Sequence, residues 1–570
     1  MECDFTIKVG GAAGQGIQTV GTLLARACRD AGYYVMGIND FESRVRGGHS
    51  FFQLRFSDRP VHAPSHQVNL LIALNEESVY LHQDEMADSG LILLDAEKDK
   101  EGISAVPFVD IAKEAGGKIY ANTVAASAAL AILGAPFELV SSMLTQVFSD
   151  KDQAVIDSNI KAAELGFEAV KDKPFSQSPL ARSSQPKGVI MDGSQALALG
   201  AVAADCRVAS FYPMSPATGI MKYLAGWTGN VPLVVEQAED EIAAINMTVG
   251  ASYAGARAMT STSGGGFCLM TEGLGLAAMT ETPVVIINAQ RPGPSTGLPT
   301  RTGQGDLLFS IHASQDDFPR FVFAPSDPAG AFAIMKKAFN LSEKYQVPAI
   351  VLADQYLAES VFTLEFALKA DDRVERFVVT DQDMDNPEKY QRFARTESGI
   401  SPRALPCQGK ALVKAASDEH REDGHISEDM DVRVTMMDKR AAKVPAMMEE
   451  MEAPRSLSPG ADVLLIAWGA SAGAVTEAVH ILRDQGVDAG CLLFTDLWPF
   501  PREKVLDCLE RSSGRIVAVE QNSTAQFSRL LRAETGIQSH GSVLRYDGRP
   551  LIPKEIADAV QQMEENGYDS

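Results

Sequence analysis

Short apolar segments that end at polar or glycine-rich turns recur along the middle of the chain. They lie at 208–212, 233–235, 258–260 and 283–288. Their length and their flanking turns are typical of strands in an alternating strand and helix pattern. We therefore predict an α/β fold with open, mostly parallel sheets. The ends of these strands should gather at one edge of a sheet, where such sheets bind ligands.

Similar patterns flank this middle region. An apolar strand at 5–9 leads into a glycine-rich stretch at 10–16 and a helical pattern up to residue 31. Near the other end, a continuous apolar strand at 463–469 precedes a helical pattern at 472–485 and two further strands. A chain of 570 residues is too long for one hydrophobic core, so we expect three or four domains.

The boundaries follow from changes in composition. The stretch 173–187 is rich in serine and proline and lacks periodicity, which indicates a linker. The stretch 371–452 is rich in Asp, Glu, Lys and Met, which indicates an irregular or helical excursion. The expected parts are a first domain at 1–172, the linker at 173–187, a central domain at 188–360, a charged connecting region at 361–455 and a last α/β domain at 456–570.

An acidic helix start follows the strand at 233–235. Its carboxylates are Glu236, Glu239, Asp240 and Glu241. One interpretation is that they only complement the positive end of the helix dipole. However, the apolar positions Ile242, Ile245 and Val249 predict a buried face, and Glu241 stands at its start. A carboxylate there should be desolvated, with a raised pKa and the ability to share a proton with a bound heterocycle.

The glycine-rich stretch near the amino terminus suggests a phosphate site, because amides at a helix start attract anions. Its Gly14 and Gly16 follow a G-x-x-G-x-G spacing, which is not the dinucleotide fingerprint, although Asp40 stands at a suitable distance. No Lys-Ser/Thr pair follows, so it is not a P-loop. The alternative is that these glycines only permit tight packing of the strand on the helix.

Composition excludes several classes of function. A formal net charge of −24 argues against nucleic acid or an anionic membrane as a partner. No apolar run approaches the ~20 residues of a membrane span, and no basic secretory start is present, so we expect a cytoplasmic protein. The seven cysteines form no Cys-x-x-Cys pair and do not resemble cluster ligands. A metal site at His420 and His425 is a weaker hypothesis than a polar loop, and we expect no metal on this chain.

Four segments together resemble a known family. They are Tyr212-Pro213-Met214-Ser215-Pro216 and its continuation to residue 219, the Glu-Asp-Glu helix start at 239–241, the Ser/Thr-Gly-Gly-Gly turn at 260–266, and the stretch 290–297. They are similar to the α subunit of 2-oxoacid:ferredoxin oxidoreductases, most of all the 2-oxoglutarate enzyme with a γ-type domain fused in front. The resemblance implies a thiamine diphosphate pyrimidine-type domain in the middle and a transketolase C-terminal-like domain at the end.

The resemblance also implies roles for particular residues. Glu241 would bond the aminopyrimidine ring of thiamine diphosphate, with Tyr212 and Pro213 beside the cofactor. Ser215 and Arg291 would hold the 2-oxoacid carboxylate, although a turn serine and a solvated strand-end arginine are the alternatives. A dicarboxylate such as 2-oxoglutarate needs a second cation, for which we nominate Arg301. In the γ-type domain, the residues implied in coenzyme A binding are Gly14, Gly16, Arg46, Gly47 and Gly48, and Ala13 stands where relatives usually have glycine.

The chain lacks motifs that the reaction requires, which indicates a partner subunit. No Gly-Asp-Gly segment with a downstream Asn offers the usual magnesium and diphosphate site. In the family, Mg²⁺ and the iron–sulfur cluster are carried by a β subunit, which implies an (αβ)₂ heterotetramer with its active site at a subunit interface. The implied reaction is the reversible oxidation of 2-oxoglutarate with coenzyme A to succinyl-CoA and CO₂, with electrons passed to ferredoxin. Alternatives are a pyruvate or branched-chain 2-oxoacid enzyme, or a noncatalytic coenzyme A or nucleotide-binding module.

Overall fold

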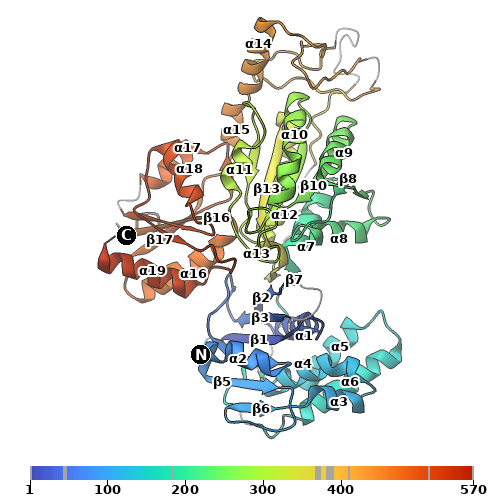
Figure 1. The fold of residues 1–570 in the computed structure, drawn as a ribbon, viewed down its shortest axis with the longest axis vertical. Coiled ribbons are helices and arrows are strands. Elements are labelled where there is room, and N and C mark those ends of the chain that lie inside the picture. The colour runs from blue at the N-terminus through green and yellow to red at the C-terminus, as the bar shows by residue number, and fades with distance from the viewer. Residues whose placement is uncertain are drawn as a thin grey trace. The chain divides into compact units, whose positions relative to one another are not determined.

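The computed structural model describes residues 3–42, 48–173, 175–181, 185–365, 374–380, 390–408, 411–510 and 514–567. The chain forms two compact units (Figure 1). The first unit comprises Met1–Asp192, Glu359–Ala367 and Ile552–Lys554, and the second comprises Gly193–Ala358, Leu368–Leu551 and Glu555–Ser570. Both units combine strands with helices, which confirms the predicted α/β class.

The first unit contains an eight-stranded sheet in the order β6-β5-β4-β1-β3-β2-β14-β7. Its strands are β1 (Asp4–Ala12), β2 (Tyr34–Asp40), β3 (His49–Ser57), β4 (Val68–Ala73), β5 (Met86–Leu94), β6 (Ile103–Ala105), β7 (Val189–Asp192) and β14 (Val361–Leu364). Its helices are α1 (Ile17–Asp30), α2 (Glu76–His82), η1 (Gln83–Glu85), α3 (Phe108–Glu114), η2 (Lys118–Tyr120), α4 (Ala121–Ile132), α5 (Phe137–Val147), α6 (Gln153–Glu168) and η3 (Pro179–Ala181). One hydrophobic core joins β1 and β3 to α1 and α4.

Strand β1 is longer than predicted. It continues through Gly10 and Gly11 to Ala12, because these residues pair with β3 from Phe51 to His49. The turn is therefore confined to 13–16. The antiparallel strand β3 lies between β1 and β2, so β1, α1 and β2 do not form the parallel unit that a dinucleotide site requires.

The second unit begins with a seven-stranded sheet in the order β18-β12-β13-β11-β10-β8-β9. Its strands are β8 (Val208–Phe211), β9 (Val234–Gln237), β10 (Ala258–Thr262), β11 (Val284–Gln290), β12 (Phe321–Phe323), β13 (Pro348–Asp354) and β18 (Asp496–Trp498). The helices that connect them are α7 (Gly193–Ala203), α8 (Thr218–Trp227), α9 (Glu241–Tyr253), α10 (Gly264–Met279), α11 (Leu307–His312), α12 (Pro328–Tyr345) and α13 (Gln355–Glu359). All pairs except β12 with β18 are parallel.

A third sheet in the second unit has the order β15-β17-β16-β19-β20. Its strands are β15 (Arg455–Leu457), β16 (Val463–Trp468), β17 (Ala489–Phe494), β19 (Arg515–Glu520) and β20 (Gly541–Leu544). Its helices are η5 (Gly469–Ser471), α16 (Ala472–Asp484), α17 (Arg502–Leu509), α18 (Gln526–Thr535) and α19 (Pro553–Asn566). Strand β18 leaves this segment to pair with β12, and one core cluster runs from Ile286 through Trp468 to Phe527. The two sheets therefore pack as one body.

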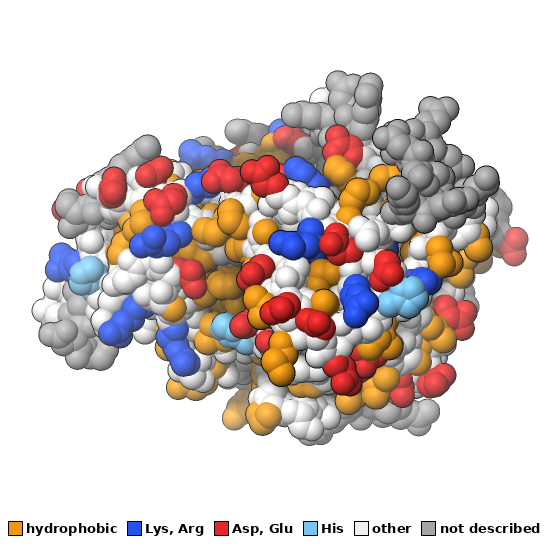
Figure 2. All heavy atoms as spheres, turned by 90° about the horizontal axis from the view of Figure 1, so that it is seen from above, with side chains coloured by type: hydrophobic (Ala, Val, Ile, Leu, Met, Phe, Trp, Pro, Cys, Tyr) orange, Lys and Arg blue, Asp and Glu red, His pale blue; other side chains and the backbone are white. Residues whose placement is uncertain are grey.

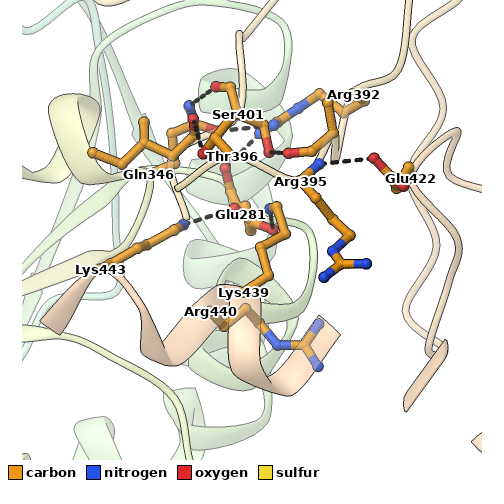
Figure 3. Close-up of polar contacts among 12 residues, drawn as sticks. Glu281, Gln346, Arg392, Arg395, Thr396, Ser401, Glu422, Lys439, Arg440 and Lys443 are labelled. Carbon is orange, nitrogen blue, oxygen red and sulfur yellow. Dashed lines mark hydrogen bonds and ion pairs between the residues drawn. The ribbon is translucent and has the colours of Figure 1, made fainter. Parts of the chain in front are cut away.

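The charged connecting region contains two helices, α14 (Met430–Ala441) and α15 (Val444–Glu450), as expected for a helical excursion. It is held by a buried carboxylate at the end of α10 (Figure 3). Glu281 pairs with the ammonium groups of Lys439 and Lys443, and Arg392 donates to its main-chain oxygen at 2.7 Å. All four side chains are buried.

A second buried carboxylate also holds the connecting region through ion pairs. Glu343 on α12 pairs with Arg257 at 3.0 Å, with Arg376 at 3.1 Å and with Arg403 at 3.4 Å. Arg376 and Arg403 both belong to the connecting region. Buried ion pairs thus attach the connecting region to α12 and to the end of α10, beside buried hydrophobic side chains such as Phe393 and Met447.

The surface seen from the side of α14 mixes acidic and basic side chains, with hydrophobic ones between them (Figure 2). The charge of −24 is therefore not gathered into one acidic field on that face. Among the helices of the described residues, none is long and apolar enough to cross a membrane.

Candidate active site

The carboxyl ends of four parallel strands meet at one edge of the seven-stranded sheet. Phe211 at the end of β8 pairs with Gln237 at the end of β9, and Thr262 of β10 pairs with Asn288 of β11. The prediction that these strand ends gather at one edge is confirmed. The helices α8, α9 and α10 start just after them and point their amino ends toward this edge.

Helix α9 carries Glu241 into the protein. Asp240 caps the helix by accepting a hydrogen bond from the amide of Ala243 at 2.7 Å, and Glu241 is only 2% exposed. The buried face contains Glu241, Ala244, Ile245, Thr248, Val249 and Ser252. Ile242 was predicted on this face but is 49% exposed, because it lies about 100° around the helix from Glu241. Glu236 belongs to strand β9 and not to the helix start.

The carboxylate of Glu241 lies over the first turn of α10. A Cβ at Gly266 would stand 2.5 Å from its Oε1, so only glycine leaves room for it. Oε1 is buried and has no hydrogen-bond partner among the residues that the structure describes. Burial raises the pKa of this carboxyl group, and the charge of Asp240 adds to the effect. Glu241 is therefore poised to share a proton with a bound molecule.

Further buried polar atoms without a partner in the described ranges surround this point. They are Thr260 Oγ1, Ser263 Oγ and Asn288 Oδ1. Asn288 also donates to Asp306 at 3.2 Å, and the Asp306 carboxylate packs on Gly264 at the start of α10. Burial raises the pKa of Asp306. Unsatisfied buried polar atoms are costly, so each of these side chains is a candidate contact for a bound polar molecule.

The sequence reasoning did not identify Asn288 and Asp306 as site residues. Asn288 was visible as a polar residue in an otherwise apolar strand, two positions before Gln290. Asp306 had no signal of its own, because it reaches the site through a loop. That loop is tied back by the amide of Asp306, which donates to Gln290 Oε1 at 3.0 Å.

The turn after β8 is joined to the end of β11. Arg291 donates from Nη1 to the main-chain oxygen of Ser215 at 2.6 Å, so the structure brings these two predicted residues together. Burial lowers the pKa of Arg291, yet a guanidinium stays charged at neutral pH. Ser215 is exposed and Tyr212 is 37% exposed. Pro213, which lies between them in the sequence, is half-buried. Exposed hydroxyl and aromatic groups at this edge are available to a ligand or a partner.

Arg301 lies in the connection between β11 and α11, ten positions after Arg291. Its side chain packs against Gly548, whose main-chain oxygen accepts a hydrogen bond from the amide of Thr302 at 3.1 Å. The structure thus ties this arginine to the C-terminal segment, and no described contact joins it to Arg291 or Ser215. The two histidines considered as metal ligands have different partners, since the ring of buried His420 packs at a tilt against Phe393 and exposed His425 pairs with Asp423.

In the first unit, the turn 13–16 connects β1 to α1. Gly14 and Gly16 have positive φ values of 92° and 80°, and Gly16 is the N-cap residue. No acidic side chain occupies the first turn of α1, which suits an anion at this helix start. Gly48, with φ of 80°, precedes β3. The predicted Arg46 and Gly47 lie outside the described residues.

Comparison with known proteins covers almost the whole chain. The family model described as "Pyruvate flavodoxin/ferredoxin oxidoreductase, thiamine diP-bdg" matches residues 199–439. Residues 6–169 match "Pyruvate ferredoxin/flavodoxin oxidoreductase", and residues 461–556 match "Pyruvate:ferredoxin oxidoreductase core domain II". The candidate site around Glu241 lies within the first of these ranges.

Individual relatives agree. The chain is 32% identical to the 2-oxoacid:ferredoxin oxidoreductase subunit alpha of Sulfolobus sp, with 98% of this chain and 97% of that one covered. It is also 32% identical to the 2-oxoglutarate synthase subunit KorA of Methanothermobacter thermautotrophicus, over 65% of this chain and 98% of that one.

A solved structure covers the chain equally well. It is the 2-oxoglutarate:ferredoxin oxidoreductase from Magnetococcus marinus with 2-oxoglutarate, coenzyme A and succinyl-CoA bound. The TM-score is 0.90 and the identity 32%, over 98% of this chain and 99% of that one. These comparisons confirm the family that the sequence resembles. The chain therefore belongs to the 2-oxoacid:ferredoxin oxidoreductases, as an α subunit.

Proposed function

We propose that this chain is the α subunit, with a γ-type domain fused at its amino end, of a 2-oxoglutarate:ferredoxin oxidoreductase. The reaction converts 2-oxoglutarate and coenzyme A to succinyl-CoA and CO₂, passes two electrons singly to ferredoxin, and is reversible. The observation that carries the proposal is the buried carboxylate of Glu241 at the strand edge, whose Oε1 has no hydrogen-bond partner among the described residues. The Magnetococcus relative, which holds the substrate, the coenzyme and the product, supports the choice of substrate.

The residues around Glu241 fit thiamine diphosphate. When bound, the cofactor supplies the carbon nucleophile that makes decarboxylation of a 2-oxoacid possible. Glu241 would hold a proton between its Oε1 and a ring nitrogen of the aminopyrimidine, which fixes the tautomer of the ring. The raised pKa of Glu241 matches this role, because the proton must be shared and not simply lost to water. Tyr212 and Pro213 would flank the cofactor from the turn after β8.

Substrate capture falls to the turn after β8 and the end of β11. Arg291 has its guanidinium held by the carbonyl of Ser215, and its remaining N–H groups suit the carboxylate next to the oxo group. The Ser215 hydroxyl would add a hydrogen bond to the same carboxylate. Arg301 is our candidate for the distal carboxylate of 2-oxoglutarate. If its removal leaves the KM for 2-oxoglutarate unchanged, that assignment fails.

The turn 13–16 is the proposed coenzyme A site. Gly14 leaves its side of the turn open to a ligand phosphate, while the side chain of Asn122 packs against Gly16 at the start of α1. Gly48 lies just before the neighbouring strand β3. Arg46 and Gly47 would contribute from the segment before it. The magnesium ion, the diphosphate site and the iron–sulfur cluster are assigned to a β subunit in a cytoplasmic (αβ)₂ enzyme.

The test is viologen reduction by this chain purified anaerobically with its co-expressed β subunit. The substrates compared are 2-oxoglutarate, pyruvate and 2-oxoisovalerate, each with and without coenzyme A. Activity that requires coenzyme A and prefers 2-oxoglutarate supports the proposal. Preference for another acid retains the mechanism and rejects the substrate. No activity in a complex loaded with thiamine diphosphate and cluster rejects the catalytic role.

A further inference from the structure

Helix α9 presents an outer face without charge. After Glu241 the helix contains no charged residue up to its end at Tyr253, although charged residues make up 22% of the chain. Its inner face packs on α10 and on strands β8 and β10 (Figure 1). On the outer face, Ile242 is 49% exposed and Met247 is 42% exposed. A helix face that meets only water normally carries charged side chains, so this face has the composition of a contact surface.

A glycine lies on the same outer face without a reason inside the chain. Gly250 is exposed, is in the middle of the helix and does not have a positive φ. A Cβ at this position would meet no atom of the described residues within 4 Å, apart from its chain neighbours and its own helix backbone. Glycine inside a helix is destabilising relative to alanine. Alanine would therefore suit the isolated chain better, which indicates that the open space serves the close approach of another molecule.

The edge of the sheet near this end of α9 is also uncharged. Strand β9 is the last in the seven-stranded order, and Val234 at its start is 59% exposed. A crossover helix runs opposite to the parallel strands that it joins, so the start of β9 and the carboxyl end of α9 lie at the same end of the unit. Free edge strands usually carry charged side chains that prevent association, yet residues 223–235 contain none. The uncharged surface therefore extends from α9 toward the sheet edge, away from the strand ends at Glu241.

The residues along α9 are arranged so that the face can cover a copy of itself. Ile242, Asn246 and Gly250 follow one another at intervals of four residues and so lie on one side of the helix. When a second α9 packs on the first in the opposite direction, about a two-fold axis at Asn246, the large Ile242 of each copy faces the small Gly250 of the other. An uncharged face can also be covered by its copy without burying an unpaired charge.

We propose that the outer face of α9 packs against the same face of a second copy of this chain about a two-fold axis. The contact goes beyond the proposed function, which names the subunits but not the surface that joins two αβ pairs. A β subunit that completes the site must reach Glu241 at the amino end of α9. Gly250 lies about 13 Å further along the helix, where the open space is left for the second copy.

The test measures the mass of the assembled complex of α and β subunits by sedimentation velocity over a range of concentrations. Gly250→Leu finds open space in its own chain, so each αβ pair should stay intact. At the two-fold contact the new side chain overpacks the facing helix twice, which should raise the dissociation constant of (αβ)₂ at least about 30-fold. Ala154→Leu, at an exposed position of α6, is the matched control and should leave the mass unchanged. Melting temperatures check that each variant is folded.

A charge exchange at the axis distinguishes a second copy from any other partner. Asn246→Lys and Asn246→Asp each bring like charges together across the two-fold axis, so each variant alone should sediment as a single αβ pair. An equal mixture of the two variants should recover (αβ)₂, because opposite charges then face each other. A contact with a different protein gives no such recovery.

Three results would overturn the proposal. One is a wild-type complex that remains a single αβ pair at all concentrations. Another is a Gly250→Leu complex that forms (αβ)₂ as tightly as wild type, because another surface then joins the α subunits. The third is loss of the β subunit from Gly250→Leu, because the face then belongs to the β subunit. None of these results depends on turnover, so the viologen assay still decides the substrate and the reaction independently.

Discussion

Arg291 donates a hydrogen bond from Nη1 to the main-chain oxygen of Ser215 at 2.6 Å. This bond ties the end of β11 to the turn after β8, two segments that come from different parts of the sequence. A flexible cation near a carboxylate would lose side-chain entropy on binding. Here one corner of the planar guanidinium is already fixed, so in the proposed role less entropy is lost when its other N–H groups bind a carboxylate.

Replacement of Arg291 by lysine should therefore weaken substrate binding more than the charge alone suggests. Lysine keeps the positive charge but cannot bond Ser215 and a carboxylate in one plane. We expect the KM for the 2-oxoacid to rise ~10- to 100-fold, as the loss of a paired charged hydrogen bond predicts. Steady-state viologen reduction measures this. Arg207→Lys, at a partly exposed arginine that pairs with Asp205, is the control. An unchanged KM for Arg291→Lys would remove Arg291 from the substrate site.

Glu241→Gln should lower turnover strongly while the protein remains folded. Gln retains the shape and one acceptor but cannot share a proton, so turnover should drop by ~10²- to 10⁴-fold. Glu239→Gln, at an exposed position two residues earlier, should be nearly silent. If the Glu241 variant keeps normal turnover, the carboxyl group has no part in proton sharing.

The same variant should be more stable at neutral pH. Burial raises the pKa of Glu241 in the folded state, so its ionisation costs free energy once the pH exceeds the unfolded value. Gln does not ionise and avoids this cost. The melting temperature of the variant should equal that of wild type near pH 4 and exceed it at pH 7 to 8. Equal melting temperatures at both pH values would show that Glu241 is not destabilised by its burial.

Local patterns in the sequence predicted the strands that end at the site and the burial of Glu241. Such patterns record which side of an element faces the core, and this information is contained in a few neighbouring residues. They failed to predict that β1 extends through Gly10 and Gly11. These two glycines stay in the strand because β3 pairs with them. They also failed for Ile242, since one helical step turns a side chain from core to surface.

Most contacts between particular side chains that lie far apart in the sequence could not be predicted. Glu281 meets Lys439 and Lys443 from positions more than 150 residues away, and nothing near any of them records the pairing. The same holds for His49 on β3 and His82 on α2, whose Nε2 atoms lie 2.8 Å apart. These contacts depend on tertiary structure, and a single sequence carries no direct signal of them.

Glu281→Gln tests whether the buried pairs hold the connecting region in place. Removing the carboxylate leaves two buried ammonium groups with no counter-charge, which should cost about 3–5 kcal/mol of stability. We expect a lower melting temperature and faster proteolysis within 390–451. Glu450→Gln removes a more exposed partner of Lys344 and should cost no more than about 1 kcal/mol. If both variants melt alike, the connecting region is held by other contacts.

Asp354 offers a second test of burial at the strand edge. It ends β13, is 2% exposed, and accepts a hydrogen bond from the amide of Leu357 at 2.7 Å. Burial raises its pKa to about 7. The folded state therefore binds this proton more tightly than the unfolded state, and stability is lost as the pH rises from about 4 to about 7.

Asn keeps the acceptor for Leu357 without the charge. Asp354→Asn should match wild type near pH 4 and be more stable at pH 8, by a margin on the order of a few kcal/mol. Calorimetric melting curves at the two pH values measure this difference. Asp327→Asn makes the same kind of bond to Gly330 at a partly exposed helix cap and should show no such pH dependence. A difference for Asp354→Asn that is equally large at pH 4 would mean that the change acts through packing and not through ionisation.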